Sequence, residues 1–204
     1  LAMHRAQHKR VIYMESSCIV AASETVEYRI PLNEIPLTKN GSINFQIENV
    51  MAAIGAGWAL GLEWAVIHDG VASFVSNTQT APGRFNLFNY RNATLIADYG
   101  HNPDAIQALV SAIDNIPSKK RSVVISAAGD RRDEDIRQQT RILGDAFDEV
   151  VLYQDQCQRG RADGEVLSLL REGLGNAKRT QKVSEIVGEA IAIDAALSNL
   201  QDGE

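Results

Sequence analysis

The sequence predicts an α/β protein in which a small α+β segment precedes an open, mostly parallel sheet with helices on both faces. Two observations support this class. Before residue 76 the apolar residues come in short runs between polar turns, whereas after residue 94 each apolar run is followed by a helical period. Between these parts, the polar segment 76–83 contains Pro82-Gly83, a turn signal. We therefore expect two domains, residues 1–80 and residues 81–204.

The first domain is expected to contain a small antiparallel meander followed by two helices. Short apolar runs bounded by polar residues are typical of hairpin strands. Val50, Met51 and Ile54 recur at helical spacing, and Gly61 suits a helix end. In chain order, the expected elements are strands at 11–13, 19–20 and 26–30 and helices at 48–60 and 63–74.

The second domain alternates strand and helix, which is the pattern of a parallel sheet. The helices are indicated by apolar residues three and four positions apart, such as Ile106, Leu109 and Val110. The weakest strand signal precedes the last helix. The expected strands are 94–97, 122–125, 150–153 and 179–183, and the expected helices cover about 106–113, 136–147, 166–174 and 184–197.

Composition excludes several classes of function. The chain has 20 Lys and Arg residues against 26 Asp and Glu residues, a formal net charge of −6, so it lacks the cationic surface that nucleic-acid binding requires. Cys18 and Cys157 form no CxxC pair, so neither a disulfide framework nor a zinc site is indicated. The longest apolar stretch, 50–62, is too short to cross a bilayer. We expect a cytoplasmic protein without nucleic-acid or membrane partners.

Polar residues follow three of the predicted strands. Ligands bind beyond the carboxyl ends of strands in an open parallel sheet, so the segments 98–104, 127–133 and 154–165 are candidate sites. Each segment also has a purely structural explanation. The first suits a helix cap before Pro103, the second a solvated charge run and the third a variable surface loop. Neither G-x-x-x-x-G-K-[ST] nor a G-x-G-x-x-G after a strand occurs, so a nucleotide would be only partly held here.

Three segments together resemble the C-terminal domain of the Mur ligase superfamily. They are Pro-Gly-Arg-Phe-Asn at 82–86, Ile-Ala-Asp-Tyr-Gly-His-Asn-Pro-Asp-Ala at 96–105 and Ala-Ala-Gly-Asp-Arg-Arg-Asp-Glu-Asp-Ile at 127–136. The resemblance implies a Rossmann-like domain from residue 81 onward. It identifies residues 1–80 as the tail of the central ATPase domain, so the chain is expected to be a fragment of a longer enzyme.

The resemblance implies an ATP-dependent ligase. Family members phosphorylate a carboxylate with ATP, and an amino group then attacks the acyl phosphate to form an amide. Segments 128–135 and 159–165 favour the branch that joins arginine to the aspartate side chains of a poly-aspartate backbone. A muropeptide or folylpolyglutamate ligase and a binding module without catalysis are the alternatives. The complete enzyme is expected to use ATP and Mg²⁺, arginine and the polymer primer, and to be a homo-oligomer, whereas the fragment is expected to be inactive alone.

The resemblance also implies roles for individual residues. Asn49 matches the family's asparagine near the adenine, Arg84 the arginine that reaches the nucleotide phosphates, and Asp98 the aspartate at the ribose. Tyr99 and His101 match the positions that follow. These groups suit their ligands, because a guanidinium fork pairs with phosphate oxygens and a carboxylate accepts from ribose hydroxyls.

Two departures from the family pattern lie next to these residues. Phe45-Gln46 replaces a His-Asn pair, and Gly100 stands where alanine is usual.

A cationic substrate such as arginine requires carboxylates nearby, which makes segments 130–135 and 155–165 the candidate recognition surfaces. No metal-ligating residue is expected. The candidate substrate-binding residues are Asp130, Arg131, Arg132, Asp133, Arg161 and Asp163.

Overall fold

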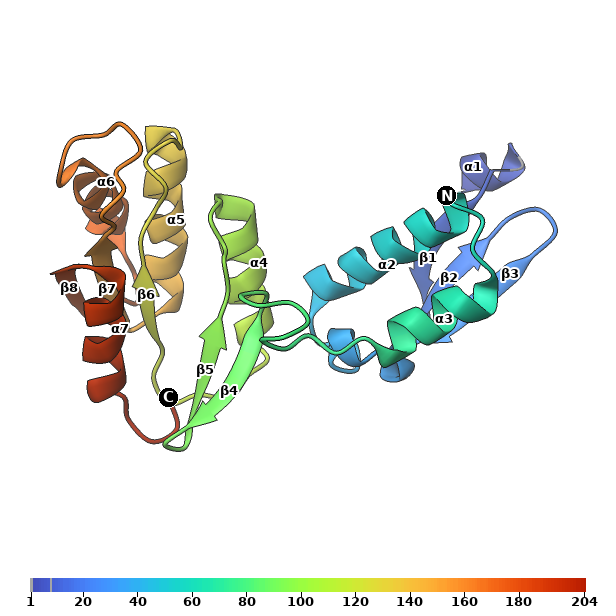
Figure 1. The fold of residues 1–204 in the computed structure, drawn as a ribbon, viewed down its shortest axis with the longest axis horizontal. Helices are drawn as coiled ribbons and strands as arrows, with labels where there is room; N and C mark the ends of the chain where they lie inside the picture. Colours follow the sequence, from blue (N-terminus) through green and yellow to red (C-terminus); the bar gives the residue numbers. More distant parts are fainter. Residues whose placement is uncertain (1, 8) are drawn as a thin grey trace. The chain divides into compact units, whose positions relative to one another are not determined.

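The computed structural model describes residues 2–7 and 9–204. The chain divides into two units, Leu1–Pro82 and Gly83–Glu204 (Figure 1). Each unit has its own sheets and helices, and each is described by itself.

The first unit is a three-stranded antiparallel meander with two long helices. β1 (Val11–Glu15), β2 (Cys18–Ala22) and β3 (Glu27–Pro31) pair in that order. Ser16 and Ser17, which join β1 to β2, have φ values of 48° and 61°, as the twist of a two-residue hairpin requires. The other elements are α1 (Ala2–Ala6), the 3-10 turns η1 (Leu32–Glu34) and η2 (Pro36–Thr38), α2 (Asn44–Ala59) and α3 (Trp64–Ser73).

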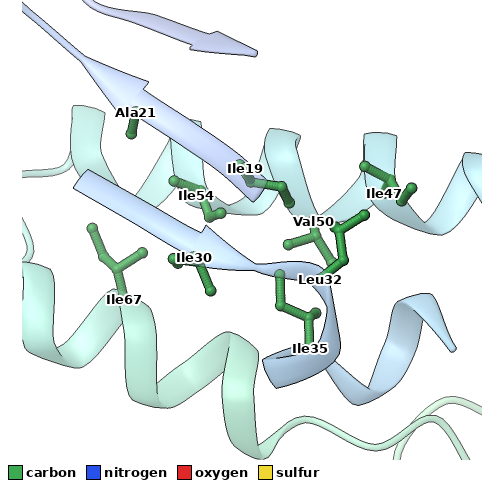
Figure 2. Close-up of a cluster of buried hydrophobic side chains, with 9 residues drawn as sticks. All are labelled: Ile19, Ala21, Ile30, Leu32, Ile35, Ile47, Val50, Ile54 and Ile67. Carbon is green, nitrogen blue, oxygen red and sulfur yellow. The ribbon is translucent and has the colours of Figure 1, made fainter. Parts of the chain in front are cut away.

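Apolar side chains from the strands and helices form the core of the first unit (Figure 2). Ile19 and Ile30 come from the meander and Ile54 from α2, and each is at most 1% exposed. Burying a side chain of this size contributes about 1.5–3 kcal/mol, so this cluster joins the helices to the sheet. Its members are Ile19, Ala21, Ile30, Leu32, Ile35, Ile47, Val50, Ile54 and Ile67.

The second unit contains two sheets. β4 (Asn86–Tyr90) and β5 (Ala93–Ala97) form an antiparallel hairpin. β6 (Ser122–Ile125), β7 (Glu149–Gln154) and β8 (Lys182–Val187) form a parallel sheet in the order β6-β7-β8. The helices are α4 (Pro103–Ile113), α5 (Asp133–Ala146), α6 (Glu165–Gly173) with the 3-10 turn η3 (Leu174–Asn176), and α7 (Glu189–Ser198).

Helices cover both faces of the parallel sheet. The chain steps from β6 to β7 to β8 in one direction, so right-handed crossovers place α5 and α6 on the same face. α4 packs beside α5, whereas α7 packs on β6, β7 and β8 (Figure 1). A strand covered on both sides has a continuous apolar sequence, and Val150, Val151 and Leu152 of β7 are at most 3% exposed.

The structure confirms the predicted α/β class, the antiparallel meander and the parallel strands β6 and β7. The prediction that residues 94–97 join the parallel sheet was wrong, because β5 pairs with β4, a strand that was not predicted from the sequence. The last strand was placed too early, at 179–183, since β8 extends to Val187. Consequently the last helix begins at Glu189 rather than at 184, after Gly188 with a φ of 98°.

The parallel sheet begins at a group of ion pairs. The carboxylate of Asp148 accepts hydrogen bonds from Nε and Nη2 of Arg179 (3.0 and 2.8 Å) and from the backbone nitrogen of Arg121 (2.8 Å). The carboxylate of the adjacent Glu149 accepts hydrogen bonds from the ammonium groups of two lysine side chains. Hydrogen bonding to Arg179 holds the pKa of Asp148 below its ordinary value. These bonds connect the start of β7 to the segments that lead into its two neighbours.

We expect Asp148→Asn to lower the free energy of unfolding by about 1–3 kcal/mol at neutral pH, because it weakens hydrogen bonds to a charged group. An aspartate in the unfolded chain has a pKa of about 3.9, and the folded pKa of Asp148 is lower. The stabilisation that ionised Asp148 contributes is therefore fully present above the unfolded pKa. The contribution is lost as the pH falls through the folded pKa. Urea denaturation over an acid pH series should therefore show wild type and variant converging, and a difference that stays constant with pH would contradict this.

Candidate functional site

The carboxyl ends of β5, β6 and β7 open onto one cavity of about 640 Å³. Residues 98–101 after β5, residues 126–128 after β6, and Asp155 and Arg159 after β7 line this end of the cavity. β5 and β6 point in the same direction (Figure 1). The three strand ends singled out in the sequence therefore surround a common space, as expected for ligand sites in open α/β sheets.

Asp98 ties the segment that carries Arg84 to the end of β5. Its Oδ2 accepts a hydrogen bond from the backbone nitrogen of Phe85 (2.9 Å), and its Oδ1 accepts one from the backbone nitrogen of Gly100 (2.7 Å). Phe85 has a φ of 51°, a left-handed conformation that costs a residue other than glycine about 1–3 kcal/mol. The hydrogen bond from Phe85 to Asp98 helps to offset this cost, and it fixes the direction in which the chain presents Arg84.

Arg84 lies over the ring of Tyr99. The guanidinium carbon is 5.4 Å from the ring centroid, which is a cation–π contact. The rings of Tyr99 and His101 are tilted against each other with centroids 5.3 Å apart, and Tyr99 is 59% exposed. Three of the residues assigned to the nucleotide by resemblance thus form one accessible surface. It offers a guanidinium to an anion and an aromatic face for stacking.

Two asparagines fix the loops on either side of β4 and β5. Asn86 is 3% exposed, and its Oδ1 accepts a hydrogen bond from the backbone nitrogen of Gly83 (2.8 Å). Asn102 caps α4, because its Oδ1 accepts from the backbone nitrogen of Ala105 (2.8 Å) with Pro103 at the first helical position. The helix-cap interpretation of segment 98–104 is therefore correct, and the same segment also lines the cavity.

Arg161 joins the loops that follow β6 and β7. Its Nε donates to the carbonyl oxygen of Gly129 (2.6 Å) and its Nη2 to that of Arg131 (2.7 Å). The same Nη2 pairs with Asp133 (2.8 Å), and Nη1 pairs with Glu165 (2.6 Å). Every guanidinium nitrogen is engaged, and the side chain is only 16% exposed. In this structure Arg161 braces two loops, a task that suits a rigid planar fork of donors.

Asp130, Arg132 and Asp163 differ in what they contact. Asp130 pairs with Arg159 at 3.2 Å, and about half of each side chain is exposed. Arg132, which precedes α5, forms a bidentate ion pair with Asp135 in the first turn of that helix, at 2.8 Å for both bonds, and is 84% exposed. Asp163 lies exposed in the loop after β7. These three side chains remain accessible to a ligand from solvent.

The two loops touch at Gly129. A Cβ at this position would lie 2.1 Å from the carbonyl oxygen of Gln158, a distance that no side chain tolerates. Gly129 thus permits a close backbone approach, and the approaching group is the neighbouring loop. Only glycine allows this contact.

Three residues that shape the site received no role of their own from the sequence. Arg159 and Glu165 lay in a stretch that was assigned to recognition as a whole. The partner of Arg159, Asp130, belongs to a distant segment, whereas Glu165 pairs with Arg161 in the same stretch. Gln139 of α5 is fully buried, and its Nε2 donates to the carbonyl oxygen of His101 (3.4 Å). A polar residue among the apolar positions of a predicted helix is the sequence signal for a residue such as Gln139. This signal can be recognised only when the buried face of the helix is known.

Asn49 belongs to the first unit, where it lies exposed on α2. Its Nδ2 donates to Oε1 of Gln46 (3.1 Å), and Gln46 is only 6% exposed. Gln46 is one of the residues at which the sequence departs from the family pattern. A buried glutamine therefore orients the Asn49 amide from within the same helix.

In ranges 2–7 and 9–204, no group of three or more His, Cys, Asp or Glu side chains is placed to hold a metal ion. Over the same part of the chain, every helix is too short or too polar to span a membrane.

Residues 83–204 match the family described as Mur ligase, glutamate ligase domain. Since this match covers more than half of the chain, the protein belongs to the Mur ligase family. Solved structures share its fold. A murein peptide ligase from Psychrobacter arcticus has a TM-score of 0.64 at 12% identity and aligns with 96% of this chain and 39% of its own. Mycobacterium tuberculosis folylpolyglutamate synthase, complexed with ADP and AMPPCP, has a TM-score of 0.64 at 22% identity, over 94% and 40%.

Among curated relatives, the chain is similar to cyanophycin synthetases, which confirms the predicted resemblance. That of Synechocystis sp. is 33% identical over 168 residues, which cover 82% of this chain and 19% of the relative. That of Trichormus variabilis is 33% identical over 164 residues, covering 80% and 18%. A UDP-N-acetylmuramoyl-L-alanyl-D-glutamate--2,6-diaminopimelate ligase from Alkaliphilus metalliredigens is 27% identical over 168 residues, covering 82% and 33%. The chain spans about a fifth of the length of the cyanophycin synthetases.

We expect Arg161→Gln to lower the free energy of unfolding by about 1–3 kcal/mol, because the shorter amide leaves several partners in both loops without a donor. Arg132→Gln is the matched control, since its pair with Asp135 is local to the start of α5 and its side chain is 84% exposed. Urea denaturation of the two variants measures the difference. Equal stability of both variants would show that Arg161 does not brace the loops.

Proposed function

We propose that this chain is part of an ATP-dependent amide-bond-forming ligase of the cyanophycin synthetase type. The observation that carries the proposal is the surface of Arg84, Tyr99 and His101, which Asp98 fixes at the carboxyl end of β5. A guanidinium fixed beside an aromatic ring and a strand-end carboxylate is chemistry suited to a nucleotide. The 33% identity to cyanophycin synthetases supports this type of ligase.

In the proposed reaction, a side-chain carboxylate of a poly-aspartate polymer attacks the γ-phosphorus of ATP, which gives an acyl phosphate and ADP. The α-amine of arginine then attacks the acyl carbon, and the new C–N bond forms as phosphate leaves and the amine loses a proton. Mg²⁺ supplies charge neutralisation on the phosphates in such transfers. Within this chain the residues hold and orient the nucleotide, and they form no covalent bond to it.

We assign the nucleotide contacts as follows. Arg84 pairs with phosphate oxygens and stabilises the charge that develops there. Asp98 accepts from the ribose hydroxyls, which is compatible with its two backbone hydrogen bonds because each carboxylate oxygen accepts more than one. Tyr99 and His101 supply neighbouring contacts. In the first unit, Asn49 is assigned to the adenine, whose mixed donor and acceptor edge an amide can match.

For arginine we propose recognition by the loops after β6 and β7. Asp133 and Asp130 already pair with guanidinium groups of the protein, Arg161 and Arg159. These loops therefore favour a guanidinium next to a carboxylate, and the exposed Asp163 is a carboxylate that a substrate cation can approach. Arg131 and Arg132 are proposed to meet the anionic polymer or its acyl phosphate, since the Arg132 side chain is 84% exposed.

The proposal includes the setting of the complete enzyme. Its partners are arginine and a poly-aspartate primer, it works in the cytoplasm, and it assembles from identical copies. A ligase that adds an amino acid to a muropeptide is the second candidate. The 27% identity to a UDP-N-acetylmuramoyl-L-alanyl-D-glutamate--2,6-diaminopimelate ligase favours that candidate over classes outside the family. Dependence of ATP cleavage on arginine separates the two.

In the full-length enzyme with an aspartate primer, we expect phosphate release from ATP to require arginine. Arg84→Ala and Asp98→Ala should each lower turnover, the first by about 10²–10³-fold because a charge-stabilising donor is lost. Arg91→Ala is the matched control, since Arg91 is an exposed arginine in the β4–β5 turn, at the opposite end of the same hairpin. Normal turnover of the Arg84 variant would rule out its assigned role.

Removing Asp163 tests the arginine site. We expect Asp163→Ala to raise the KM for arginine and to leave the KM for ATP unchanged, because the lost carboxylate faces only the cationic substrate. Asp133→Ala should do the same and also weaken the Arg161 brace. Asp145→Ala, an exposed change at the far end of α5, serves as the control. An unchanged KM for arginine in both test variants would place the site elsewhere.

A further inference from the structure

Among the residues that the structure describes, four carboxylates line the cavity, and two of them are engaged by other parts of the protein. Asp98 accepts hydrogen bonds from two backbone nitrogens. Glu204 lies 3.8 Å from the ammonium group of Lys120. The other two, Asp155 and Glu189, form no ion pair with a lysine, arginine or histidine of the described part of the chain. These two carboxylates are therefore available to a cation that enters the cavity.

Tyr153 fixes the side chain of Glu189. Glu189 is the first residue of α7 and is exposed, whereas Tyr153 lies near the end of β7 and is half-buried. The hydroxyl of Tyr153 donates a hydrogen bond to Oε1 of Glu189 (3.3 Å). Burial and the nearby Glu189 carboxylate raise the pKa of Tyr153 to about 12, so this hydroxyl keeps its proton at neutral pH. The bond engages one oxygen of Glu189 and leaves Oε2 available to a ligand.

A buried hydroxyl without a partner lies beside Tyr153. Ile125 of β6 pairs with Leu152 of β7, so Ser126 and Tyr153 are neighbours one residue further along the two parallel strands. Ser126 lines the cavity, and its Oγ is buried without a hydrogen-bond partner among the described residues. Leaving a buried hydroxyl unpaired is unfavourable. This part of the cavity therefore lacks a polar group that a bound ligand can supply.

The chemistry of this region suits a guanidinium. A guanidinium is planar and always charged, pairs with carboxylates and stacks on aromatic rings. Asp155 and Glu189 supply the carboxylates, while Tyr99 and Tyr153 supply aromatic rings, and all four residues line the same cavity. A neutral or anionic ligand would leave both carboxylates unpaired.

We propose that Glu189 binds the guanidinium of the incoming arginine and determines the preference of the enzyme for a cationic side chain. Asp155 is the second carboxylate of this subsite, and Tyr153 is a positioning residue that orients Glu189. The inference rests on the proposed function, because it names the residue that recognises its substrate. A guanidinium has several N–H donors, so it can pair with Glu189 and also reach a carboxylate of the loops after β6 and β7.

Citrulline tests this assignment, because it carries a neutral urea group in place of the guanidinium. Phosphate release from ATP by the full-length enzyme with an aspartate primer is measured with each amino acid, and the two kcat/KM values are compared. In Glu189→Gln we expect the ratio of arginine to citrulline to fall by about tenfold or more, because a hydrogen-bonded pair with a charged group is lost. The KM for ATP should stay unchanged. Glu189→Asp, which keeps the charge, should retain more of the preference.

Asp194→Asn is the matched control. It removes one negative charge from an exposed position of the same helix that does not line the cavity, so the ratio should stay at the wild-type value. Tyr153→Phe removes only the hydroxyl that orients Glu189. It should lower the ratio in the wild-type background and have no further effect in the Glu189→Gln background, because its effect passes through Glu189.

An unchanged ratio in Glu189→Gln, with phosphate release that still requires arginine, would overturn this inference and leave the proposed function standing. An equal fall of the ratio in Asp194→Asn would also overturn it, because any negative charge on α7 would then have the same effect. Phosphate release that does not require arginine in the wild type would overturn the proposed function and this inference with it.

Discussion

The Asp98 carboxylate is the constraint on which the site depends. One oxygen holds the backbone of Phe85, in a left-handed conformation, and the other holds the turn at Gly100. The segment carrying Arg84 is thereby joined to the end of β5, and the guanidinium comes to lie over Tyr99. A carboxylate that organises its own neighbourhood in this way restricts Arg84 before any ligand arrives, and under the proposed function this preorganisation would favour phosphate transfer.

The loops after β6 and β7 are restrained by ion pairs rather than by apolar burial. The guanidinium of Arg161 donates hydrogen bonds to two carbonyl oxygens and two carboxylates, and Gly129 allows the two loops to contact each other. Hydrogen bonding to Asp133 and Glu165 raises the pKa of Arg161, so the guanidinium stays positively charged. This side of the site is consequently rich in guanidinium–carboxylate pairs. A substrate guanidinium would find there the same partners that the protein's own arginines use.

The sequence predicted what local pattern determines and missed what depends on distant partners. The helices and the apolar strand β7 were readable because their periodicity is set by burial on one or two faces. The pairing of β5 was not, since β4 contains the buried Asn86 and the exposed Leu87 and Phe88, and shows no strand-like alternation. Likewise, the strand ends could be identified as candidate sites, but the partners of Arg161 could not, because they lie 28 to 32 residues away along the chain for three of its four contacts.

The central proposal is that Asp98 acts on the nucleotide partly through Arg84. A double-mutant cycle on kcat/KM for ATP in the full-length enzyme tests it directly, with Asp98→Asn, Arg84→Ala and the double variant. If Asp98 positions Arg84, the Asp98 change should have a much smaller effect once Arg84 is absent, with a coupling free energy in the range of about 0.5–3 kcal/mol. Additive effects of the two changes would contradict the claim, because they would mean that the two residues act independently.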